Sequence, residues 1–148
     1  MRAEEPARAG WSPFLARYQR LQWRRRIGDG ARIDRFGGLH GMRDEGALDS
    51  ALMAPSNREH YEAAGIATCA ATYAYHLTKN HPFLDGNKRI GAAVAEIFVR
   101  LNGAYLTAGN DEIVNLFLGI AAGTISRDEV ERAFAGWIVV TPPPVSPI

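Results

Sequence analysis

Apolar positions recur at helical spacing through most of the chain and predict a series of helices. Two stretches, residues 66–80 and 88–101, are apolar around most of their circumference, which is typical of the central helices of a bundle. Three amphipathic stretches flank them: residues 44–54, which Pro55 is expected to end, 110–122 and 126–137. Apart from short extended pieces at 33–36 and 104–107, no strand pattern stands out. We therefore predict an all-α helical bundle.

Capping residues mark where these helices begin and end. Asp44 and Asn110 are expected to cap two of them, and Ser126 forms a capping box with Glu129 before the last. The pair at 102–103, Asn-Gly, is typical of a helix C-terminus. Within the helices, we expect Cys69 to be an inert core residue, His76 to be a packing or surface residue and Trp137 to close the core. Glu96 and Arg100 are expected to form an ion pair on the surface. Outside the helices, His60 and Tyr61 are expected to lie on a surface loop.

Composition narrows the class of protein. The 148 residues are 47% hydrophobic and 22% charged, the ordinary range for a globular domain, so wholesale disorder is excluded. A single cysteine excludes an internal disulfide. The uncharged stretch at 63–78 is too short and too polar for a membrane span, and no secretory signal pattern is present, so we expect a cytoplasmic protein.

Charge is distributed unevenly along the chain. Residues 1–32 carry eight arginines against three acidic residues, whereas the remainder is acidic by four charges. Such an arm could contact nucleic acid, but it contains no recognised nucleic-acid motif, so a solvated surface is favoured and a direct nucleic-acid partner is not expected. The expected organisation is a basic arm at 1–26, a main domain at 27–138 and a proline-rich mobile tail at 139–148.

The segment from His81 to Arg89, His-Pro-Phe-Leu-Asp-Gly-Asn-Lys-Arg, lies between the two central helices, at the N-terminus of the second. A helix N-terminus favours phosphate, Gly86 lets the chain approach a ligand closely, and Asn87 can donate to an oxygen. Lys88 and Arg89 place two cations where the helix dipole disfavours them. Because this placement costs stability unless an anion is bound, the segment predicts a polyphosphate site.

Two more residues of this segment make the predicted site reactive. Asp85 supplies the hard oxygen ligand that Mg²⁺ prefers, and His81 is the natural general base for a hydroxyl at neutral pH. Each residue alone is more often structural, since Asp-Gly-Asn is common turn chemistry. Eight specified residues in nine positions outweigh that reading. Together they indicate nucleotide-dependent group transfer onto a hydroxyl.

This nine-residue segment resembles the signature of the Fic/Doc superfamily, in particular its death-on-curing (Doc) toxin branch. Residues 29–48, 57–62, 101–103 and 121–126 are also similar to Doc sequences. The resemblance implies a Fic/Doc helical bundle that uses ATP and Mg²⁺, with His81 as base and Asp85 as metal ligand. It implies that Gly86, Asn87, Lys88 and Arg89 bind the phosphates. It also implies that a glycine-rich flap containing Gly37, Gly38 and His40 docks the target by strand addition, and an ordinary flexible loop is the alternative for this segment.

Departures from the wider superfamily refine these expectations. Fic proteins that transfer AMP carry glycine at the position of Lys88 and a second arginine at that of Ala92. Doc proteins share the lysine, which implies a reversed ATP and transfer of its γ-phosphate to a threonine or serine of a target protein. The family target is translation elongation factor Tu, and a Phd-like antitoxin silences the toxin through a disordered C-terminal segment. Gly86 replaces an alanine of some Doc toxins and makes the loop more Fic-like.

Two alternative functions remain open at the level of sequence. One is an AMP-transferase with the same residues and the other nucleotide pose. The other is a catalytically silent module that holds a partner or nucleic acid through the basic arm. Label from the α- or γ-phosphate of ATP separates the first alternative from a kinase, and His81→Ala separates the second from any enzyme.

Overall fold

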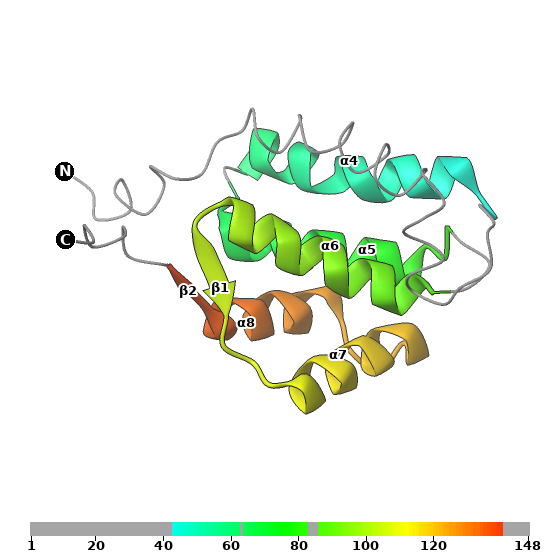
Figure 1. The fold of residues 1–148 in the computed structure, drawn as a ribbon. Helices are drawn as coiled ribbons and strands as arrows, with labels where there is room; N and C mark the ends of the chain where they lie inside the picture. The colour runs from blue at the N-terminus through cyan, green and yellow to red at the C-terminus, as the bar shows by residue number, and fades with distance from the viewer. Residues whose placement is uncertain (1–42, 63, 83–85, 141–148) are drawn as a thin grey trace, which may run out of the picture.

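The computed structural model describes residues 43–62, 64–82 and 86–140 (Figure 1). Within these ranges it contains five helices and one small sheet, which confirms the all-α prediction. In chain order the elements are α4 (Glu45–Glu62), α5 (Ile66–Lys79), α6 (Asn87–Leu101), β1 (Ala104–Leu106), α7 (Asn110–Ala122), α8 (Arg127–Trp137) and β2 (Ile138–Val140). The predicted basic arm, the extended piece at 33–36 and the flap lie outside the described residues.

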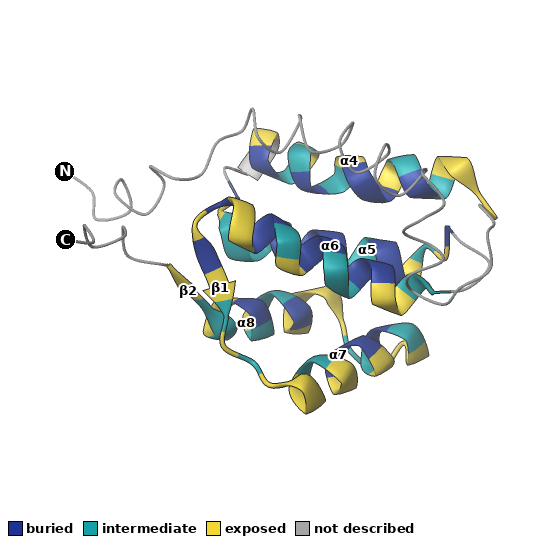
Figure 2. Ribbon diagram, viewed as in Figure 1, coloured by how far each residue is buried: buried dark blue, intermediate teal, exposed yellow. Residues whose placement is uncertain are grey.

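Helix α5 is the centre of the bundle, as its pattern predicts. It packs against α4, α6, α7 and α8, and most of its residues are buried (Figure 2). Alanines at 70, 71 and 74 let the neighbouring helices approach closely. The rings of Tyr73 and Phe98 meet edge to face, 5.1 Å apart, between α5 and α6. Cys69 is fully buried, which confirms its place in the core.

The predicted end of the first helix at Pro55 is wrong, because α4 continues through it to Glu62. Pro55 removes one helical hydrogen bond, at a cost of about 3 kcal/mol. Burying Leu48 and Leu52 against the core contributes about 1.5–3 kcal/mol each and offsets that cost. The same extension corrects the loop expected at His60 and Tyr61, since both lie in the last turn of α4.

Strand β1 pairs with β2 in an antiparallel ladder that joins the chain after α6 to the end of α8. Its register places Ala104 opposite Val140, Tyr105 opposite Val139 and Leu106 opposite Ile138. The strand predicted at 104–107 is therefore present. Val139 and Val140, assigned from sequence to the C-terminal tail, are instead part of this sheet.

The helix caps mostly follow the sequence signals. The box at α8 is formed: the Ser126 amide donates to Glu129 Oε1 at 2.8 Å, and the Glu129 amide donates to Ser126 Oγ at 3.2 Å. The cap of α7 is Gly109, one residue before the expected Asn110, and its amide donates to Glu112 Oε1 at 2.9 Å. None of the helices that the structure describes is long and apolar enough to cross a membrane.

Candidate functional site

The loop residue Gly86 sets the start of α6. It is the N-cap residue with φ 80° and ψ 12°, the left-handed region that glycine adopts without a steric penalty. Its carbonyl accepts the first helical hydrogen bond, from the amide of Ile90 at 2.9 Å. Glycine brings no side chain to cap the helix. The first-turn amides of any α-helix have no backbone partner within the helix.

Two cations lie in the first turn of α6, and that turn contains no acidic residue. Lys88 and Arg89 are exposed, whereas Ile90 and Gly91 are buried against α5. The burial of the second pair therefore turns the first pair outward. Positive side chains at the positive end of the helix dipole create a local field that attracts anions.

The imidazole of His81 faces the first residue of α6. His81 Nδ1 lies 3.5 Å from Asn87 Nδ2, the outer limit of a hydrogen bond. With the amide nitrogen of Asn87 facing the ring, Nδ1 of His81 accepts a hydrogen bond, and the proton of the neutral ring lies on Nε2. If the Asn87 carboxamide rotated and presented its oxygen, the ring proton would lie on Nδ1 and Nε2 would be the basic atom. Because His81 is exposed, its ring can contact a substrate.

The backbone of His81 has an unusual conformation. Its φ is 49°, and it is the only non-glycine residue with positive φ among those described. This conformation costs of order 1–3 kcal/mol and persists only where the surroundings enforce it.

The start of α4 supplies such surroundings. Arg43 donates from Nε to the carbonyl of His81 at 2.7 Å and from Nη2 to that of Asn80 at 3.1 Å. The amides of Arg43 and Asp44 both donate to the carbonyl of Pro82, at 2.7 and 3.0 Å. The sequence signals singled out only Asp44 of this pair, and only as a cap, because backbone carbonyls leave no side-chain pattern. The cap itself forms, with the amide of Ala47 donating to Asp44 Oδ1 at 3.0 Å.

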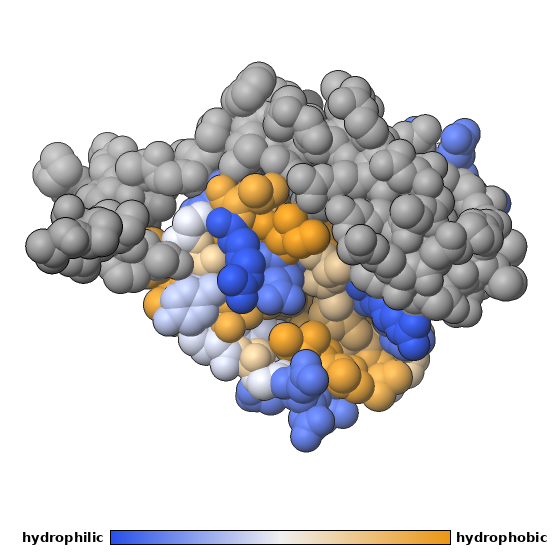
Figure 3. All heavy atoms as spheres, in the orientation of Figure 1, coloured by the Kyte–Doolittle hydropathy of each residue, from blue (hydrophilic) through white to orange (hydrophobic). Residues whose placement is uncertain are grey.

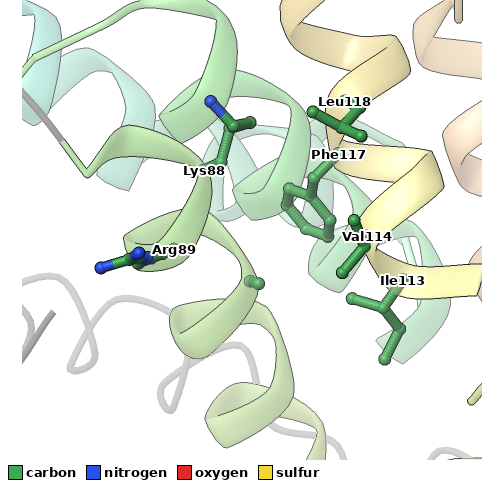
Figure 4. A pocket seen from close by; sticks show the side chains of 7 residues that line it. Lys88, Arg89, Ile113, Val114, Phe117 and Leu118 are labelled. Carbon is green, nitrogen blue, oxygen red and sulfur yellow. The ribbon is translucent and has the colours of Figure 1, made fainter. Parts of the chain in front are cut away.

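A pocket of about 240 Å³ opens between α6 and α7, next to the two cations (Figure 4). Its walls are largely apolar and comprise Lys88, Arg89, Ala92, Ile113, Val114, Phe117 and Leu118. The side chains from α7 project toward α6, whereas the guanidinium of Arg89 points away from them. Apolar side chains gather over α7 on the face shown in Figure 3, and Val114 and Leu118 are about half exposed.

Several predicted site residues lie outside the described part of the chain. They are the magnesium ligand Asp85 and the three flap residues Gly37, Gly38 and His40. Among the described residues, no group of three or more histidine, cysteine, aspartate or glutamate side chains is placed to hold a metal ion. The structure thus brings together His81, Gly86, Asn87, Lys88 and Arg89 on the two sides of one loop.

A second polar cluster lies between α4, α5 and α8. Arg58 forms an ion pair with Glu131 and donates to Thr72 Oγ1 at 3.3 Å, and Arg127 lies 3.8 Å from the same glutamate. Burial and then the two arginines lower the pKa of His76 below its usual value of 6.5. His76 is half-buried, as expected of a packing residue. We interpret the cluster as a connection between three helices.

Comparison with known proteins agrees with the geometry of the loop. The family model described as Fic/DOC family matches residues 16–99, more than half of the chain. Protein kinase doc of Escherichia phage P1 is 35% identical over 101 residues, which cover 68% of this chain and 79% of that protein. Toxin Doc of Mycolicibacterium smegmatis is 32% identical over 106 residues, which cover 69% of this chain and 82% of that protein. The chain therefore belongs to the Fic/DOC family.

Proposed function

We propose that this protein is a Doc-type protein kinase that transfers the γ-phosphate of ATP to a threonine or serine hydroxyl of a target protein. The observation that carries the proposal is the pairing, across one loop, of an exposed histidine with a helix start that has a left-handed glycine and two exposed cations. Such a start suits a phosphate group, and the histidine suits a hydroxyl next to it.

In the proposed reaction the target hydroxyl is the nucleophile and His81 accepts its proton. The oxygen attacks the γ-phosphorus, the bond from that phosphorus to the bridging oxygen breaks, and ADP leaves. Lys88, Arg89 and the first-turn amides of α6 stabilise the charge on the transferred group. With the Asn87 carboxamide rotated so that its oxygen faces the ring, Nδ1 carries a proton and Nε2 would be the atom that receives the proton of the hydroxyl.

Magnesium is the expected metal of this site, and the chemistry of the donors agrees with it. Asp85 would provide the carboxylate oxygen, one residue before the glycine at which α6 begins. A bound Mg²⁺ would neutralise charge on the phosphate oxygens. Lys88 and Arg89 would orient the same phosphates through their own hydrogen bonds.

The side chains at 88 and 92 support transfer of the γ-phosphate over transfer of AMP. Lys88 brings a long side chain to the place where the AMP-transferring relatives have glycine. Ala92 lines the pocket between α6 and α7, where an arginine would extend into the space. Both differences change the room available to the nucleotide, which supports the reversed pose.

The names of the relatives support the biological setting. One is called a protein kinase and another a toxin, so we propose that this chain is the toxin of a toxin–antitoxin pair. Translation elongation factor Tu is the proposed target, with arrest of translation as the result. A Phd-like antitoxin that orders its C-terminal segment on this protein is the proposed partner.

The experiment that tests the proposal uses the purified full chain, Mg²⁺, elongation factor Tu and two batches of ATP, labelled at the γ- or the α-phosphate. His81→Ala is the control variant, and we expect it to reduce transfer at least about 100-fold, the usual contribution of a general base. Label from γ alone supports the kinase. Label from α would make the protein an AMP-transferase, and equal labelling by the variant would remove His81 from the reaction.

A further inference from the structure

Residues 80–82 follow α5 and include the proposed base His81. Their backbone is hydrogen-bonded to the residues at the start of α4. All three carbonyls of this tripeptide accept hydrogen bonds from Arg43 or Asp44, four bonds in total, across 37 or more positions of sequence. A fifth bond runs the other way, from Asn80 Nδ2 to the carbonyl of Ala47 at 3.3 Å.

Two of these bonds come from a single guanidinium. Arg43 Nε reaches the carbonyl of His81 while Nη2 reaches that of Asn80, so one planar group bridges two consecutive carbonyls. The fixed fork of arginine matches this arrangement, whereas a lysine has one nitrogen and no fixed spacing. The pair of bonds therefore fixes the orientation of the peptide plane between Asn80 and His81 and of the one that follows.

The orientation of these planes decides where the imidazole points. Residue 81 has φ 49°, and the direction of its Cα–Cβ bond follows from the backbone on either side. The guanidinium of Arg43 donates to carbonyls of the segment, and the ring of His81 is exposed and faces Asn87. Pro82 is buried and its carbonyl is bound to the amides of Arg43 and Asp44, which anchors the far side of the histidine.

We propose that Arg43 is a positioning residue for the transfer reaction, because its guanidinium holds the backbone of His81 in the left-handed conformation that aims the imidazole at the start of α6. The inference rests on the proposed function for its effect on catalysis, but the effect on the ring of His81 is independent of any activity. Arg43 acts through His81 and does not touch the reacting atoms in this assignment.

The test compares Arg43→Met, which keeps an unbranched apolar stem and removes the donors, with Arg132→Met, the same change at an exposed position on α8. Arg43→Lys keeps the charge without the fork. The kcat for phosphate transfer and the KM for ATP are measured for each variant, together with the ring ¹H–¹³C signal of His81 in the free protein. That signal is assigned by its loss in His81→Ala, and the thermal midpoint is recorded in parallel.

We expect Arg43→Met to reduce kcat about 10- to 100-fold, because a catalytic group displaced by about 1 Å can lose a factor of about 100 in rate. The KM for ATP should change by less than about twofold, because the hydrogen bonds of Arg43 go to the backbone of residues 80–82 and not to the proposed phosphate binders at 86–89. The ring signal of His81 should broaden or shift in Arg43→Met and Arg43→Lys. In Arg132→Met, kcat and the ring signal should match those of the unmodified protein.

Three results would overturn the proposal. They are an unchanged ring signal in Arg43→Met, an unchanged kcat in that variant, or full recovery of both by lysine. Loss of activity together with a fallen thermal midpoint and an unmoved ring signal would make Arg43 merely structural. Full activity of His81→Ala would refute the proposed base and leave the ring signal to decide whether Arg43 positions residue 81.

Discussion

Helices α6 and α8 begin in opposite ways, although both start in the same small bundle. Helix α8 has a serine N-cap in an extended conformation, a complete capping box and two acidic residues in its first turn. Helix α6 starts at a left-handed glycine, with two basic residues and no acidic residue in that turn. Capping and dipole effects therefore stabilise the start of α8 and destabilise the start of α6.

Under the proposed function, the difference separates a helix start that stabilises the fold from one that would bind a ligand. At α8 the acidic side chains occupy the place that an anion would take, so the helix dipole is balanced within the chain. At α6 the first turn contains no acidic residue that would balance it. The free energy lost there is expected to return when phosphate binds, which couples nucleotide binding to the stability of the protein.

Reversing the charge at the start of α6 tests this contrast most directly. Lys88→Glu should reduce phosphate transfer at least about 100-fold, because it removes a phosphate ligand and repels the anion. The same change should raise the free energy of unfolding by about 0.3–1 kcal/mol, since an acid suits the helix N-terminus. Transfer assays and urea unfolding measure the two effects. A variant that loses both activity and stability would contradict the contrast.

The glycine at the start of α6 provides a second, smaller test. Gly86→Ala should destabilise the protein by about 1–2 kcal/mol, because an L-residue pays a steric cost at φ 80°. Gly65→Ala is the matched control: Gly65 is the N-cap of α5, its φ is −89°, and a Cβ there would meet nothing within 4 Å. Thermal unfolding of both variants should show a clear loss only at position 86.

Removing the cap of α8 should affect stability alone. Ser126→Ala deletes the hydroxyl that accepts from the amide of Glu129, and should cost about 1 kcal/mol. Phosphate transfer per folded molecule should be unchanged, because α8 carries none of the residues around the loop. Urea unfolding and the transfer assay give the two values. A matching loss of activity would show that α8 and the site are coupled.

The smallest expected effect is a pH dependence at the same cap. Hydrogen bonds from the backbone and then the side chain of Ser126 lower the pKa of Glu129 below 4.5. A lowered folded-state pKa gives stabilisation that is complete above pH 4.5 and is lost as the pH falls through the folded-state pKa. Glu129→Gln should therefore be less stable than the unmodified protein at pH 6. A gap in urea midpoint that stays constant down to pH 3 would refute this assignment.

Local signals in the sequence account for most helix boundaries. The C-terminal ends of α5 and α6 and the start of α8 follow from Pro82, Gly103 and Ser126, so local sequence contains that information. Helix α4 differs because the local preference of Pro55 is overridden by packing of Leu48 and Leu52 on the core. Strand β2 likewise depends on a partner more than 30 residues away.

In the candidate site, too, some residues could be found from local sequence and others only from the fold. His81, Asn87, Lys88 and Arg89 belong to one short segment, and their grouping could be read from spacing alone. Arg43 could not, because its partners are backbone carbonyls of residues 80 and 81, which look alike in every sequence. The pocket beside Ala92 also depends on how α7 crosses α6, which periodicity does not specify.

The single cysteine at the centre of the bundle has a practical consequence. Cys69 is the only thiol in the chain and has no exposed surface; it lies on α5, and its Sγ is 3.7 Å from the carbonyl of Pro55 in α4. A thiol reagent added to the native protein can react only after α4 and α5 separate locally, so the labelling rate measures how often the bundle opens there. One absorbance trace without denaturant would then report how nucleotide, or any change at the start of α6, shifts the lifetime of the closed bundle.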